Sequence, residues 1–290
     1  MASPRELRPR IASIASTAQI TRAMQMVAAA KMRKAQQATL MTRPFAQLLY
    51  RFQRRATTHA RSFSHPLLEV RNVRKRAVIL VGTDKGLCGA LNTNLFRVAA
   101  QFDPATTVFI TAGKRAAQFV ARTGRQLAAE FTFTDSPRFA EARPIAGMAR
   151  DMFLKGEVDE VKIVATRFIN TMTQQAGAVE FLPIGAIKGL QVPGAESEAD
   201  LAADTTEYLF EPGPEATLSF LFGLYLNVIV YRALLEAKAS EQSARMVAMK
   251  NATDSAADLI EDLTLEYNKL RQGNITNELL EIAGGQLGND

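Results

Sequence analysis

The sequence is poor in the residues that most often build chemical sites. It has one cysteine, Cys88, and two histidines, His59 and His65. A single cysteine excludes an internal disulfide and a multi-cysteine metal cluster, and it fits a reducing compartment. The two histidines fall in one basic connector without the spacing of metal ligands. We therefore expect no bound metal and no cofactor.

The chain also lacks a long uninterrupted apolar run. The longest, Phe220–Tyr231, is too short to cross a bilayer and contains Asn227. The first ten residues, MASPRELRPR, contain no apolar segment of the kind found in a signal peptide. We therefore expect this chain to reach a membrane only through partner proteins.

Helix-breaking residues are almost absent from the C-terminal part. From Pro214 to about Gly273 the chain has one further glycine, Gly223, and no further proline, so a single helix can run through it. About 58 residues at 1.5 Å each make a rod of roughly 87 Å, which exceeds an ordinary domain and needs a partner helix. Its apolar positions alternate in steps of three and four, as in a coiled coil, with Gln242 filling the one gap. They are Leu235, Ala239, Met246, Met249, Thr253, Ala256, Ile260, Leu263, Tyr267 and Leu270.

The N-terminal part offers the partner helix. Ser3, Pro4 and Glu6 form a typical helix start, and the positions that follow have a similar spacing. They are Leu7, Ile11, Ile14, Ala18, Thr21, Ala28, Met32 and Ala35. Because many of them are small, this helix suits close antiparallel packing against the C-terminal one. Pro44 is expected to kink or interrupt the helix, which then resumes over Phe45–Arg55.

The middle of the chain changes to the pattern of an α/β domain. Short apolar, β-branched runs predict strands, and the segments between them predict helices. The strands are expected at Ala77–Gly82, Thr106–Ala112, Val161–Ala165 and Ala178–Ile184, and the helices at Leu91–Phe102, Lys114–Thr123 and Arg138–Leu154. A polar connector, Gln191–Gly213, leads into the long helix. The predicted division is 1–58 for the N-terminal helix, 77–190 for the α/β domain and 214–290 for the C-terminal helix.

Positive charge is concentrated at the N-terminal end. Residues before Ala77 include sixteen Lys or Arg but only two acids, Glu6 and Glu69, whereas the remainder is net acidic. Such an arm favours an anionic partner, which is nucleic acid, lipid head groups or an acidic protein surface. The alternative is a helix face that is simply solvated.

Two segments resemble chemical sites only weakly. The loop TDKGLCGALN, Thr83–Asn92, lies between a strand and a helix, where phosphate-binding loops occur, but it matches neither common glycine-rich pattern. A tight turn through Gly86 and Gly89, a helix cap from Asp84 or Asn92, and a small buried Cys88 explain it better. Four acids lie largely off the apolar positions, which predicts a solvated helix face: Asp258, Glu261, Asp262 and Glu266.

Four motifs together closely resemble one protein family. They are ITRAMQMVAAAKMRKA at Ile20–Ala35, GTDKGLCGALN at Gly82–Asn92, SEQSARMVAMKNATDSAADLI at Ser240–Ile260 and YNKLRQGNITNELLEIAGG at Tyr267–Gly285. In this order and at these places they are similar to the gamma subunits of bacterial F-type ATP synthases. The segment from Gln126 to Gly213 matches weakly.

The resemblance implies a fold and a mechanical role. The fold class is an antiparallel coiled coil of long N- and C-terminal helices with an inserted Rossmann-like α/β domain. The role is that of the central-stalk rotor of a proton-translocating complex, present in one copy and without an active site of its own. The implied partners are the alpha, beta and epsilon subunits and the c-ring, and the implied location is the cytoplasmic face of the bacterial plasma membrane.

The same resemblance assigns coupling contacts to the alpha and beta subunits. The N-terminal motif carries Arg22 and Met24, and the C-terminal motifs carry Arg245, Gln272, Thr276 and Glu278. The basic arm adds a physical reason, because long cations attract an acidic loop and can exchange partners as the shaft turns. Lys31, Arg33 and Lys34 are weaker candidates of the same kind.

Two other functions remain open from the residues alone. A nucleic-acid-binding coiled-coil protein would use the basic arm, although no base-stacking or groove-reading motif is present. A nucleotide- or thiol-dependent enzyme would use Thr83–Asn92, with Cys88 beside Lys85 as a weak nucleophile.

Overall fold

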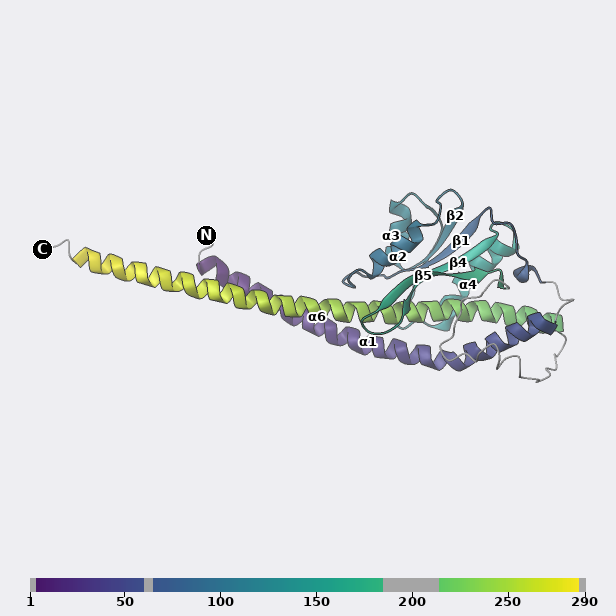
Figure 1. Cartoon of the computed structure of the whole chain (residues 1–290), viewed down its shortest axis with the longest axis horizontal. Coiled ribbons are helices and arrows are strands. Elements are labelled where there is room, and N and C mark those ends of the chain that lie inside the picture. The colour runs from purple at the N-terminus through teal and green to yellow at the C-terminus, as the bar shows by residue number, and fades with distance from the viewer. Residues whose placement is uncertain (1–3, 60–64, 185–213, 287–290) are drawn as a thin grey trace. The chain divides into compact units, whose positions relative to one another are not determined.

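The computed structural model describes residues 4–59, 65–184 and 214–286 (Figure 1). The chain divides into two compact units, 29–244 and 1–28 with 245–290. Both long helices contribute to each unit. The predicted division into 1–58, 77–190 and 214–290 was drawn at the ends of helices and strands, not at the boundaries of these units. It stays a prediction. The predicted connector Gln191–Gly213 and the predicted cap Ser3 lie outside the described residues.

The two long helices are present as predicted, but both are longer than expected. Helix α1 spans Pro4–His59 and helix α6 spans Pro214–Gln286. Helix α6 begins at Pro214 and continues past Gly273, because a glycine inside a helix costs only about 1 kcal/mol relative to alanine. The predicted seam is confirmed in α1, where Leu7, Ala28 and Ala35 are buried while the residues between them are mostly exposed.

Of the kink or interruption expected at Pro44, the interruption does not occur, and the kink stays a prediction. Helix α1 continues through this residue to His59. A proline inside a helix removes one backbone hydrogen bond and crowds the preceding turn, at a cost of about 3 kcal/mol. That local cost does not end the helix when helix-forming sequence continues on both sides, as Phe45–Arg55 does here.

The α/β domain contains one five-stranded sheet of order β3-β2-β1-β4-β5. Strands β1 to β4 are parallel, and β5 pairs antiparallel with β4. The elements in chain order are 3₁₀ helix η1 (Pro66–Leu68), β1 (Arg76–Val81), α2 (Leu91–Ala100), β2 (Thr107–Ala112), α3 (Lys114–Arg122), β3 (Gln126–Phe131), α4 (Phe139–Leu154), β4 (Glu160–Phe168) and β5 (Gln174–Leu182). This order confirms the Rossmann-like fold class.

Strand β3 was not predicted, and β5 is shifted relative to the prediction. The β3 sequence QLAAEF lacks β-branched residues, and the strand lies at the sheet edge, where its side chains are mostly exposed. Strand β5 begins four residues before the predicted Ala178 and ends at Leu182 instead of Ile184. It ends there because Pro183 has no backbone N–H to donate to the sheet.

The sheet has an apolar core on each face. Ala77, Ile79 and Val81 of β1 pack on the side covered by α4 and by residues 221–237 of α6, whereas Val78 and Leu80 pack on the side of α2 and α3. Strand β1 is therefore buried on both faces, which explains its continuous apolar sequence. By length and composition one helix, over Ser219–Asn277, could cross a membrane, but 56% of its apolar window is buried inside the protein, as in a core helix.

The loop after β1 differs in one detail from the prediction. Neither Asp84 nor Asn92 caps α2, whose cap residue, Ala90, has no side-chain cap hydrogen bond. Instead Asp84 accepts a hydrogen bond from the backbone N–H of Lys114 (3.0 Å), at the start of α3, and Asn92 donates to the Thr83 hydroxyl (2.8 Å). The loop thus joins two neighbouring helices of the domain. Cys88 is buried, as predicted.

Candidate coupling surface

The smaller unit is an antiparallel pair of helix segments, 4–28 of α1 and 245–286 of α6 (Figure 1). The hydroxyls of Thr21 and Thr253 lie 2.7 Å apart and show which residues of the two helices face each other at this point of the unit. Leu7 and Leu263 are buried in the same seam. The predicted positions of α6 are confirmed here, since Met249, Thr253, Ala256, Ile260, Leu263, Tyr267 and Leu270 are buried or half-buried.

All six predicted coupling residues belong to this unit. Arg22 and Met24 lie one and three residues beyond Thr21 on α1, and Arg245 lies eight residues before Thr253 on α6. Because the helices are antiparallel, these three residues fall within about 12 Å along the axis. Gln272, Thr276 and Glu278 lie roughly 40 Å further along α6. The structure therefore places the six in two groups rather than in one site.

The first group differs in exposure. Arg22 is exposed, Met24 is half-buried, and Arg245 is 9% exposed. Because Arg245 is buried, its replacement by a smaller residue affects packing as well as charge. Arg22 therefore has the more accessible cation of the two arginines.

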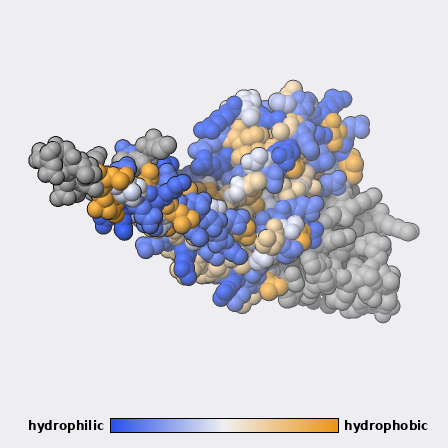
Figure 2. All heavy atoms as spheres, turned by 60° about the vertical axis from the view of Figure 1, so that its left-hand side comes forward, coloured by the Kyte–Doolittle hydropathy of each residue, from blue (hydrophilic) through white to orange (hydrophobic). Residues whose placement is uncertain are grey.

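The second group lies where α6 extends beyond its partner helix. Gln272 and Thr276 are exposed, and the Thr276 hydroxyl donates to the Gln272 carbonyl (2.9 Å); Glu278 lies in the same helix. Figure 2 shows hydrophobic side chains beside the grey atoms at the end of this helix, and the exposed large apolar residues there are Ile275, Leu279 and Leu280. Exposed apolar side chains grouped on one helix end mark a surface for another protein.

The weaker candidates belong to the larger unit and differ from one another. Arg33 and Lys34 are exposed. Lys31 forms an ion pair with Asp135 (2.5 Å), so its ammonium already has an acidic partner within the chain. Sequence reasoning missed this contact, because the two residues are 104 positions apart and no local pattern connects them.

Comparison with known proteins gives a consistent result. The family model described as ATP synthase matches residues 3–287. The ATP synthase gamma chain of Opitutus terrae is 44% identical over 290 residues, which cover 99% of this chain and 98% of that protein. The gamma chain of Methylacidiphilum infernorum is 41% identical, with 99% of both chains covered. The chain belongs to the ATP synthase gamma family.

Solved structures agree with this gamma assignment. A chain in the central stalk and c-ring structure of the Tetrahymena thermophila mitochondrial ATP synthase is 25% identical, with a TM-score of 0.61 over 80% of this chain and 99% of that one. A chain of the Euglena gracilis mitochondrial enzyme has a TM-score of 0.67 at 19% identity, over 98% of this chain and 94% of that one, and it supports the fold alone. This gamma chain is a rotor-stalk subunit of an F-type ATP synthase.

The four acids of α6 considered from the sequence lie on the surface of the gamma chain. Asp258, Glu261, Asp262 and Glu266 are exposed on α6, as expected of a solvated face. Within the described ranges 4–59, 65–184 and 214–286, no group of three or more His, Cys, Asp or Glu side chains is arranged to hold a metal ion.

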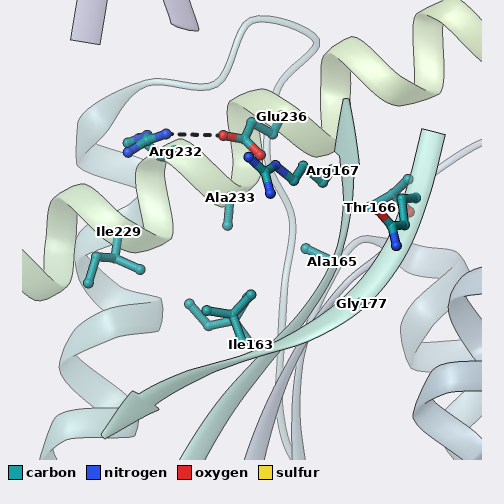
Figure 3. Close-up of a pocket in the computed structure, with 11 residues that line it drawn as sticks. Ile163, Ala165, Thr166, Arg167, Gly177, Ile229, Arg232, Ala233 and Glu236 are labelled. Carbon is teal, nitrogen blue, oxygen red and sulfur yellow. Dashed lines mark hydrogen bonds and ion pairs between the residues drawn. The ribbon is translucent and has the colours of Figure 1, made fainter. Parts of the chain in front are cut away.

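One small cavity lies between α6 and strands β4 and β5 (Figure 3). It has a volume of about 220 Å³, and its lining includes Ile163 and Ile229. At its edge Arg232 pairs with Glu236 at 3.3 Å. Nε and Nη1 of Arg232 are buried and have no hydrogen-bond partner among the described residues. The cavity therefore does not identify a ligand.

Proposed function

We propose that this gamma chain transmits rotation between a membrane ion-driven ring and a hexamer of alpha and beta subunits through the surface built by residues 4–28 and 245–286. The observation that carries the proposal is that all six coupling positions fall in this unit, with Arg22, Gln272 and Thr276 exposed. The unit buries its own seam and leaves its outer faces to a partner.

The same proposal places catalysis in the other subunits. A shaft accelerates no reaction itself, but it can favour different conformations of its partners when its contacts with them differ. The two coupling groups lie on different levels of one asymmetric helix pair, so a rotation changes which side chains face a given subunit. Exposed cations such as Arg22 supply attraction to an acidic loop that can form again at each position.

The partners and the location follow as part of this proposal. The Tetrahymena structure is titled as a central stalk with a c-ring, and a Euglena structure names F1 and the c-ring. We propose the alpha, beta and epsilon subunits and the c-ring as partners, one copy per complex, and a peripheral position at the cytoplasmic face of a bacterial plasma membrane. No nucleic acid is required.

Replacing Arg245 by alanine is expected to reduce ATP synthesis driven by an ion gradient by roughly tenfold, which corresponds to about 1.4 kcal/mol of lost differential contact energy. ATP hydrolysis by the same complex should fall less, because the catalytic subunits themselves are unchanged. The measurement compares both activities in membrane vesicles that contain the assembled enzyme.

Arg8→Ala is the matched control for this change. Arg8 is exposed on α1 and lies outside the coupling motifs, so synthesis in this variant should equal that of the unchanged enzyme. Equal synthesis in Arg245→Ala and Arg8→Ala would exclude Arg245 from coupling. Salt-sensitive binding of DNA or RNA by the purified chain would instead support the nucleic-acid alternative.

A further inference from the structure

Four charged side chains form one cluster in the larger unit. The carboxylate of Asp135, in the loop between β3 and α4, lies 2.5 Å from the Lys31 ammonium of α1 and 3.0 Å from the Lys238 ammonium of α6. Lys238 also contacts Glu241, one turn further along α6, at 3.0 Å. One carboxylate of the α/β domain therefore binds both long helices.

The inner half of the cluster is almost fully buried. The side chain of Lys238 is 2% exposed and that of Glu241 is 4% exposed, whereas Asp135 and Lys31 are 51% and 42% exposed. The Lys238 ammonium also lies 5.4 Å from the centre of the Phe133 ring. Buried charges are costly unless their partners stay in place, so this geometry penalises any displacement of α6 against the loop.

The loop that carries Asp135 is itself held in a defined shape. Glu141 of α4 accepts hydrogen bonds from the backbone N–H groups of Arg138 (2.7 Å) and Thr134 (3.3 Å). The Thr134 hydroxyl donates to the Ser136 carbonyl (2.8 Å) across the turn. These hydrogen bonds therefore hold the turn that carries Asp135 in one conformation.

Further polar contacts tie α6 to the domain on the same side. The Ser240 hydroxyl donates to the Thr166 carbonyl (3.2 Å), and the Ser243 hydroxyl donates to the Thr171 carbonyl (2.8 Å). Together with Lys238 they span more than one turn of α6. The axial position of α6 on the domain is thus defined at several points.

The apolar seam at this level defines the register of the two helices only weakly. Its buried members include Met32 and Ala35 on α1 and Ala239 on α6. Small side chains and a flexible methionine pack almost equally well after a shift of one turn, because no large side chain must leave a matching hole. A specific polar contact is therefore needed to select one register of the two helices.

We propose that Asp135 is a positioning residue that fixes the register of α1 against α6. A slip of one turn would move Lys31 about 5.4 Å along the axis and break its contact with Asp135, while Asp135 stays bound to the buried Lys238. The Lys31–Asp135 pair is half exposed, so it contributes at most about a fivefold preference (about 1 kcal/mol), which is enough to favour one of two registers that pack almost equally well. The inference is independent of the coupling residues and of the proposed partners.

Asp135 and Lys238 keep their charges at physiological pH. Hydrogen bonds from Lys31 and Lys238 hold the pKa of Asp135 well below its usual range. Burial lowers the pKa of Lys238, but Glu241 and Asp135 more than offset that effect, so the pKa lies above its usual value. Asp135→Asn therefore removes a charge that is present whenever the enzyme works.

Disulfide trapping in the assembled complex tests this register directly. Ala35 and Ala239 are buried seam positions of the two helices within the larger unit, so the disulfide yield between cysteines at these two positions serves as the reference for the unshifted register. Cysteines at Ala35 and Gln242 report a shift of α1 against α6 by about one turn, and the bond between them is called the shifted disulfide. Cys88 is replaced by serine in all variants. A disulfide forms only when the two Cβ atoms approach within about 3.5–4.5 Å.

Asp135→Asn is expected to raise the yield of the shifted disulfide about fivefold relative to Asp151→Asn. Asp151 is a matched control, because it is 52% exposed and pairs only with the neighbouring Arg150 among the described ion pairs. Asp135→Glu keeps the charge and should keep the shifted yield near that of the control.

A second variant covers the case in which Asp135→Asn fails to assemble. Lys31→Met changes a side chain that is 42% exposed and leaves the pairing of Asp135 with Lys238 in place, so it should fold and still raise the shifted yield. Shifted yields in Lys31→Met and in any assembled Asp135→Asn that equal the Asp151→Asn value would overturn the proposal.

Discussion

Replacing Lys238 by methionine is expected to lower the free energy of unfolding of the α/β domain by about 3–5 kcal/mol. Methionine has a similar length, so the change removes charge with little change in volume. Asp135 and Glu241 would each lose a cation at 3.0 Å, and Glu241 is 4% exposed, so water cannot readily replace that cation. The measurement is a urea titration of the purified chain followed by far-UV circular dichroism.

Lys155→Met is the matched control for Lys238→Met. Lys155 is exposed at the end of α4, and the same chemical change there should alter stability by less than about 0.5 kcal/mol. If the two variants unfolded at the same urea concentration, the buried cluster would not contribute to the stability of the domain.

Replacing Gly113 by alanine is also expected to lower the free energy of unfolding of the α/β domain by about 3–5 kcal/mol. Gly113 has φ +99° and begins α3, and an added Cβ would lie 2.6 Å from the carbonyl oxygen of Gly82. That oxygen belongs to the backbone directly after the buried strand β1 and cannot move without moving the sheet. The change combines an unfavourable backbone conformation with a steric overlap.

Gly124→Ala separates the two causes. Gly124 also has a positive φ, +64°, but nothing lies within 4 Å of an added Cβ. Only the unfavourable backbone conformation of alanine acts there, so the free energy of unfolding is expected to fall by about 1 kcal/mol. Urea titrations of the two variants measure the difference, and an equal loss would show that the approach of Gly113 to β1 is not as tight as the structure has it.

The long helices could be predicted from the sequence because their signal is local and repeated. The positions from Leu7 to Ala35 and from Leu235 to Leu270 keep a constant spacing, and the structure buries or half-buries them. The β1 strand was equally clear, since it is buried on both faces and its sequence is apolar throughout. Patterns of this kind depend only on neighbouring residues.

The features that sequence reasoning missed depend on distant residues. Strand β3 forms because β2 offers a free edge, and its own sequence, with two alanines and a glutamate, gives little sign of a strand. The interruption expected at Pro44 rested on the local cost of a proline alone, whereas the helix continues on both sides of it. Asp135 and Lys238 lie far apart in the sequence and meet only through the tertiary fold, so no spacing in the sequence joins them.

For the coupling residues, the sequence named the positions but not their exposure. Resemblance to a family named Arg22, Met24, Arg245, Gln272, Thr276 and Glu278, and the structure places them all in one unit. Their exposure could not be read from the motifs, and it differs greatly, from a buried Arg245 to an exposed Gln272. Which of them contacts which subunit stays a prediction, because it depends on the partners.

The most direct test of a rotor role is to watch the chain turn. Cys88 is 2% exposed and unsuited to labelling, so a bead is attached through Met172→Cys, at a position that is 76% exposed in the β4–β5 turn. The alpha-beta hexamer of the assembled complex is fixed to a surface and supplied with ATP. The account predicts continuous rotation of the bead in one direction, which stops when ATP is removed. A bead that stays still while the same complexes hydrolyse ATP would contradict it.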